Sequence, residues 1–129
     1  MTDAQRELAH RAHERLAAAR HLCDGGFFDD AASRAYYAMA RMAEAALLEP
    51  DIAPKTHKGL RGQFGKQFAT TGTFSTELGR NLRRAFDLRQ MAEYSGTNLS
   101  TETTNDVIEQ AASFVKTVES YLEESETNA

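Results

Sequence analysis

Arg89 falls among apolar residues, although it carries a charge that it cannot lose. With Leu78 placed at zero on a helical wheel of about 100° per residue, Leu82 and Ala85 lie near zero, and Arg89 falls at about 20°. Burial of a guanidinium requires carboxylate partners or an anionic ligand. The pattern therefore predicts an anion-binding site, a structural ion pair, or an arginine that extends to solvent near the helix end.

A second group of candidates lies opposite the apolar side of segment 27–48, where Tyr37 falls between Arg34 and Arg41. A tyrosine beside arginines could stack on a base and hold a phosphate. The same residue types are enriched at subunit interfaces. The plainest interpretation is a surface ion pair between Arg41 and Glu44 with Tyr37 half covered, and all three stay open.

The histidines give weaker evidence for a functional site than the arginines do. His57 stands between Lys55 and Lys58 at an expected helix start, where Thr56 is a natural N-cap. His10 and His13 have a spacing that could ligate a metal, but no thiol or carboxylate set accompanies them, so we expect no metal site. The glycines at 59, 62 and 65 follow no strand and are no dinucleotide fingerprint, and we expect no cofactor.

Charge is unevenly distributed in this chain of net charge −4. Residues 55–89 carry eight lysines and arginines, Arg84 among them, and only two acidic residues, Glu77 and Asp87. Residues 90–129, in contrast, carry one lysine and eight acidic residues. A basic middle can mark an anion-binding face or reflect ordinary internal pairing.

Five segments with a 3.6-residue apolar period must position these side chains: 2–23, 27–48, 57–69, 75–94 and 100–122. Thr2 and Ser75 are expected N-caps. Glycines at 25 and 26, prolines at 50 and 54, the run 70–73 and the run Ser95–Asn98 separate the segments. Short loops between long amphipathic helices predict an all-α, up-and-down bundle of four long helices and one short helix, with a frayed acidic tail from about Glu123.

The chain of 129 residues is the size of one domain, and we expect residues 1–129 to form it. A single cysteine, Cys23, excludes a disulfide framework and makes the cytoplasm the expected location. No apolar run approaches the roughly 18 residues of a membrane span, and the charged N-terminus lacks the apolar centre of a signal peptide.

Three blocks of the chain resemble the HEPN domain superfamily: SRAYYAMARMAEAALLE (33–49), PKTHKGL (54–60) and LGRNLRRAFDLRQMAEY (78–94). More narrowly, the chain is similar to the small stand-alone prokaryotic HEPN proteins that are often encoded beside a minimal nucleotidyltransferase. The resemblance extends over about residues 5–124. It implies a helical bundle, usually dimeric, with a role in toxin–antitoxin, stress or defence systems, where many members are metal-independent ribonucleases.

Active members of that superfamily carry an arginine followed, after four to six residues, by a histidine. Arg89 stands at the matching place, but Tyr94, Ser95 and Gly96 fill the slots where the histidine belongs. Tyr94 is a weak base near neutral pH, because a tyrosine pKa is about 10.

Two functional hypotheses follow. In the first, a dimeric binding module uses Arg89, Tyr94 and the basic region to hold RNA or a nucleotide, or to dock a nucleotidyltransferase. The residues expected to bind are Arg34, Tyr37, Arg41, Lys55, His57 and Arg84. In the second, a ribonuclease toxin uses Arg89 with Tyr94 or His57. A purely structural partner protein, with Arg89 in an internal ion pair, is the third possibility.

Overall fold

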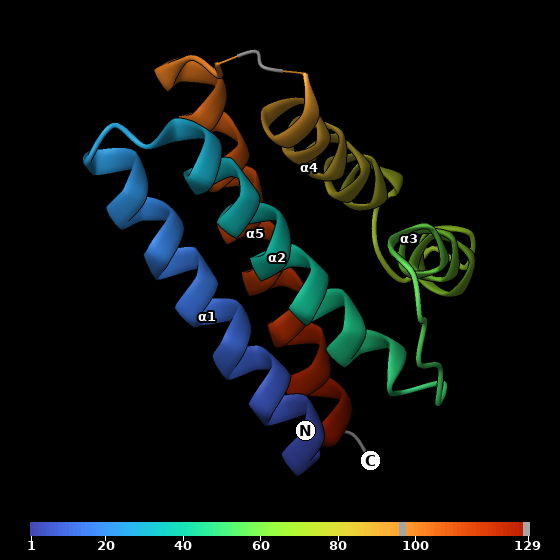
Figure 1. The fold of residues 1–129 in the computed structure, drawn as a ribbon. Helices are drawn as coiled ribbons and strands as arrows, with labels where there is room; N and C mark the ends of the chain where they lie inside the picture. Colours follow the sequence, from blue (N-terminus) through green and yellow to red (C-terminus); the bar gives the residue numbers. More distant parts are fainter. Residues whose placement is uncertain (96–97, 128–129) are drawn as a thin grey trace.

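The computed structural model describes residues 1–95 and 98–127, with side chains through residue 125, and is helical with no strand in that part. Its elements are α1 (Asp3–Asp24), α2 (Phe28–Leu47), α3 (His57–Phe64), the π-helical turn η1 (Gly65–Ala69), α4 (Thr76–Tyr94) and α5 (Thr101–Thr127). The four long helices run alongside one another, and α3 is seen nearly end-on beside α4 (Figure 1). The expected bundle of four long helices and one short helix is confirmed.

Local signals explain where most helices begin. Thr2 and Gln5 form a capping box at the start of α1, in which the Thr2 hydroxyl accepts from the Gln5 amide at 3.1 Å. Thr56 caps α3 in the same way, accepting from the Gly59 amide at 2.9 Å. Ser75 is the N-cap of α4, as expected, although its side chain makes no capping hydrogen bond.

Two other boundaries differ from the sequence expectation. The helix expected over 57–69 changes to π-helical geometry at Gly65, where three glycines in seven residues weaken the α-helical preference. The last helix continues to Thr127 rather than fraying from Glu123, because its polar end adds further turns to a helix already held by packing. The expected break at Ser95–Asn98 includes Gly96 and Thr97, which lie outside the described residues.

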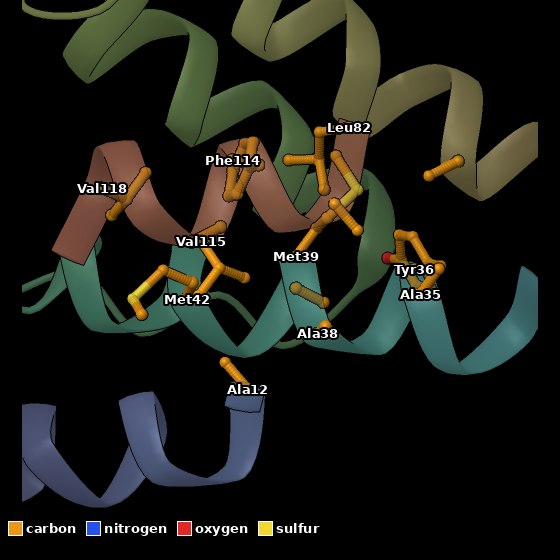
Figure 2. Packing of buried hydrophobic residues seen from close by; sticks show 14 of the residues in the cluster. Ala12, Ala35, Tyr36, Ala38, Met39, Met42, Leu82, Phe114, Val115 and Val118 are labelled. Carbon is orange, nitrogen blue, oxygen red and sulfur yellow. The ribbon is translucent and has the colours of Figure 1, made fainter. Parts of the chain in front are cut away.

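Helix α2 is the centre of the bundle and packs against α1, α4 and α5. Most of its residues are buried, and many of these are alanines, which allow neighbouring helices to approach closely. Figure 2 shows Ala12 of α1 facing α2 on one side, while Met39 points toward Leu82 of α4 on the other. Tyr36 lies near one end of this packed row.

An aromatic cluster anchors the end of α3, where Phe64 contacts one phenylalanine before α4 and another on α5. The Phe64 ring stacks on Phe74 with centroids 5.7 Å apart and contacts Phe114 at 5.3 Å. Such pairs contribute about 0.5–1.5 kcal/mol each beyond the area they bury. The cluster therefore holds the C-terminal end of α3, the helix that carries His57 and Arg61. None of the described helices is long and apolar enough to cross a membrane.

Candidate functional site

Side chains from three helices meet at one end of the core. Helix α2 contributes two tyrosines and an arginine, α3 a histidine at its first position and an arginine in its last turn, and α4 a phenylalanine and an arginine. We name this group the aromatic–arginine cluster; its members are Tyr36, Tyr37, Arg41, His57, Arg61, Phe86 and Arg89.

Tyr36 is the buried centre of the cluster. Its ring makes edge-on contacts with Tyr37, His57 and Phe86, at centroid distances of 5.3, 5.4 and 5.5 Å. Burial raises the pKa of Tyr36 to about 12, against the opposing effect of the nearby arginines. The phenol therefore keeps its proton at neutral pH.

The Tyr36 hydroxyl is hydrogen-bonded to Nδ1 of His57 at 2.6 Å. Within the described part of the chain the hydroxyl has no other hydrogen-bond partner, so we assign the phenol as donor and Nδ1 as acceptor. The imidazole hydrogen then resides on Nε2. His57 in this tautomer offers a donor, rather than a lone pair, on its other nitrogen.

Burial is also the main reason that the pKa of His57 is lowered from its usual value, followed by the positive charges of Arg89, Arg61 and Arg41. Glu44 acts in the opposite direction but more weakly. His57 is therefore neutral at pH 7. An anion entering the cluster would offset the arginine charges and favour the protonated ring.

Arg89 lies inside the cluster, with only 13% of its side chain exposed. Its guanidinium carbon is 5.1 Å from the Tyr37 ring centroid and 5.9 Å from that of Tyr36. Nε lies 3.3 Å from a carboxylate oxygen of Glu93, within ion-pair distance, yet this buried nitrogen makes no hydrogen bond. The two charges attract, but the buried Nε–H lacks hydrogen-bond geometry toward the carboxylate and stays unsatisfied.

The other two arginines differ in their pairing. Arg41 forms a 2.6 Å ion pair with Glu44 and lies 5.7 Å from the Tyr37 ring centroid. Arg61 stacks on Phe86 at 3.9 Å, and its Nη1 is a second buried nitrogen without a hydrogen-bond partner. Arg61 forms no ion pair with any described residue.

Together these groups form an array of donors with excess positive charge. Three guanidiniums converge, but among the described residues only Glu44 and Glu93 pair with them, and two buried N–H groups find no partner there. Buried polar groups without partners are costly, so such donors are typical of a site that receives a ligand. The arrangement can hold an anion, with aromatic faces beside it for a planar group.

The structure brings four of the sequence-predicted site residues together: Arg89, Tyr37, Arg41 and His57. The expected ion pair between Arg41 and Glu44 is present, and Tyr37 is partly buried beside it.

The remaining candidates lie outside the cluster. Tyr94 is 76% exposed and lies about 140° round α4 from Arg89. Arg34 and Lys55 are exposed, and Arg84 donates to the Gln110 side chain at 2.9 Å. Tyr94, Arg34 and Lys55 are therefore not members of the cluster, and Arg84 lies in the neighbouring groove between α3 and α4.

Sequence reasoning missed Tyr36, Arg61 and Phe86. Tyr36 and Phe86 each fall about 80° from the centre of their apolar stripes, at the edge where a side chain is covered on one side only. Large aromatic side chains at that edge were the sequence signal that could have identified both residues. Arg61 follows Leu60 on α3, and only the position of α4 shows that it faces Phe86.

The histidines of α1 have ordinary surface partners. His10 lies 3.5 Å from Glu14, and His13 lies 2.9 Å from Glu119. Among the residues described, no three His, Cys, Asp or Glu side chains gather in a way that could hold a metal ion.

Comparison with known proteins agrees with this architecture. The chain is 37% identical over 124 residues to UPF0332 protein glr0978 of Gloeobacter violaceus, covering 95% of this chain and 98% of that protein. It is 34% identical over 113 residues to a Methanocaldococcus jannaschii protein named "Putative toxin MJ0605", covering 88% and 84%. A second protein of that organism, "Putative toxin MJ0142", is 32% identical over 117 residues, covering 90% and 80%. The HEPN domain family matches residues 5–121, and the chain therefore belongs to the HEPN domain family.

Proposed function

We propose that the aromatic–arginine cluster binds a phosphate of an RNA strand, and that the chain is an RNA-binding, toxin-type HEPN protein. The observation that carries this proposal is the pair of buried, unsatisfied donors, Arg89 Nε and Arg61 Nη1, beside an arginine charge without a carboxylate partner. Arginine is well suited to phosphate because its donors match the geometry of the oxygens. The names of the two archaeal relatives support the toxin context.

RNA fits better than a free phosphate because aromatic faces adjoin the donors. Tyr37 is only partly buried and lies beside both Arg41 and Arg89. Base stacking on such a ring contributes about 1–3 kcal/mol per base. A nucleotide should therefore bind more tightly than the inorganic anion alone.

Titration of the protein with diuridine monophosphate and with inorganic phosphate tests this proposal. Tyrosine fluorescence is a suitable signal, because the chain contains no tryptophan. We expect the dinucleotide to bind more tightly, with an affinity that decreases as salt increases. Absence of binding by either compound at millimolar concentration would refute the proposal.

A second candidate function is metal-independent cleavage of the bound RNA, favoured by the common position of His57 and Arg89. Both lie against the same two tyrosine rings, with His57 5.4 Å from Tyr36 and 6.1 Å from Tyr37, centroid to centroid. In such a reaction the ribose 2′-oxygen forms a bond to phosphorus as the bond to the 5′-oxygen breaks. His57 would accept the 2′-hydroxyl proton in its other tautomer and return it to the leaving oxygen, while Arg89 stabilises the phosphorane charge.

The test is incubation of RNA with the protein in excess chelator, followed by analysis of the product ends. Cleavage should give 2′,3′-cyclic phosphate and 5′-hydroxyl ends, and His57→Gln should abolish it. Tyr94→Phe is the control and should cleave normally. Loss of cleavage in Tyr94→Phe but not in His57→Gln would assign the role to Tyr94 instead.

We further propose that the chain acts in the cytoplasm as a homodimer with a nucleotidyltransferase-fold partner, as its resemblance to the small stand-alone HEPN proteins implies. Light scattering should give about twice the chain mass of 14.3 kDa. Co-purification with a nucleotidyltransferase encoded beside it tests the partner. A monomer at high concentration would contradict the dimer.

A further inference from the structure

A basic groove lies beside the aromatic–arginine cluster, between the α3–η1 segment and α4. It has a volume of about 670 Å³, and its walls carry five basic side chains: Lys58, Arg61, Arg80, Arg83 and Arg84. In the part of the chain that the structure describes, Asp87 is the one acidic residue that lines it, and it pairs with Arg83 at 3.6 Å. The groove therefore has a strong excess of positive charge.

Three glycines line the same groove: Gly62, Gly65 and Gly79. A Cβ added at any of them would meet no atom within 4 Å, so packing does not require glycine there. None has a positive φ that would require it either. Glycine is among the least favourable residues inside a helix, and the property it provides here is an open, flat floor.

Arg61 connects the groove to the cluster. Its guanidinium stacks on Phe86 in the cluster, and the same side chain lines the groove. A strand whose phosphate is held near Arg89 therefore has a continuous basic path past Arg61. Along α4 the lining residues extend from Thr76 to Asp87, about 16 Å at 1.5 Å per residue.

We propose that this groove is a second subsite, which binds the nucleotides of a single RNA strand that flank the phosphate in the cluster. The inference rests on the proposed RNA-binding function. Positive walls that follow a sugar–phosphate backbone are the usual means by which proteins hold single strands. An acidic protein segment would match the charge, but it would not account for the continuity with a phosphate-sized donor array beside aromatic rings.

The experiment compares the affinities of a dinucleotide and an octanucleotide for a set of variants. Gly79→Leu fills the groove floor without changing charge, and Arg80→Gln combined with Arg83→Gln removes two positive charges. Both should weaken octanucleotide binding about tenfold and leave dinucleotide binding unchanged. The salt dependence of octanucleotide binding should also become shallower in the charge variant, by about 0.7 in logarithmic slope per lost phosphate contact.

Matched controls stand on α1, away from the groove. Ala17 is exposed, so Ala17→Leu adds the same leucine side chain, and Arg11→Gln removes a surface arginine paired with Glu7. Neither should change either affinity. Gly79→Leu should also raise the melting temperature by a few degrees, so weaker binding cannot come from loss of fold.

The outcomes separate this inference from the proposed function. If the groove variants bind the octanucleotide like the unchanged protein, the groove is not a subsite, although the cluster remains a phosphate site. If they lose the dinucleotide as well, the groove is not a separate subsite. If the unchanged protein binds neither oligonucleotide, both proposals fail. Equal competition by a poly-glutamate peptide would overturn RNA in favour of an acidic protein ligand.

Discussion

Replacing Arg89 with methionine distinguishes a ligand-binding arginine from a structural one. Methionine preserves the apolar stem that packs in the cluster but removes the guanidinium. If Arg89 serves a ligand, the variant should keep its stability and lose its affinity for RNA. If Arg89 is structural, stability should fall as well.

The contacts of Arg89 predict a small change in stability. Two contacts with aromatic faces, at 5.1 and 5.9 Å, contribute about 0.5–1 kcal/mol each. The pair with Glu93, four residues along the same helix, adds about 0.3–0.5 kcal/mol. Leaving the buried Nε without a hydrogen bond costs about 1–3 kcal/mol, which offsets these gains. We therefore expect the free energy of unfolding to change by no more than about 1 kcal/mol.

The effect on binding should be much larger. Charge-assisted hydrogen bonds from the guanidinium to a phosphate contribute about 1.5–3 kcal/mol. Their loss corresponds to about ten- to hundredfold weaker binding of diuridine monophosphate. Calorimetric titration measures this affinity, and thermal unfolding followed by circular dichroism measures stability on the same samples.

Arg11→Met is the matched control, because Arg11 Nε also pairs with a glutamate four residues away, at 3.1 Å, but on an exposed surface without rings. It should change neither stability nor affinity. A buried ion pair broken on one side costs about 3–5 kcal/mol. A fall of more than about 10 °C in the melting temperature of Arg89→Met would show that Arg89 is structural and refute the reasoning.

Three further predictions concern His57, Tyr36 and the packing of α1 against α2. The lowered pKa of His57 means that the folded protein binds fewer protons than the unfolded chain just below pH 6.5, so stability should fall as the pH drops through this range. RNA affinity should rise over the same range as His57 becomes charged, and calorimetry should show no such rise in His57→Gln. Tyr36→Phe removes the partner of His57 Nδ1 and should lower the free energy of unfolding by about 0.5–1.5 kcal/mol, measured in urea; no change would contradict the hydrogen bond. Ala12→Leu should cost about 1–3 kcal/mol by overfilling the α1–α2 seam, whereas Ala17→Leu on the exposed side should be nearly neutral.

The sequence by itself determined the helices and the class of fold. Apolar residues at helical spacing specify which face of each segment is buried, and capping residues such as Thr2 and Thr56 specify where two of the helices start. The same periodicity identified Arg89 as the arginine on a buried face, because that property depends on its own helix alone.

Only the tertiary structure decided which side chains meet Arg89. His57 and Tyr36 are 21 residues apart, on either side of a loop without periodic pattern, and their hydrogen bond requires α3 to cross α2 at one particular place. Contacts of Phe64, the last residue of α3, with Phe74 and with Phe114 of α5 help to set that place. Periodicity specifies the face of a helix but neither its crossing angle nor its height along a neighbour, and the convergence of Arg41, Arg61 and Arg89 depends on both.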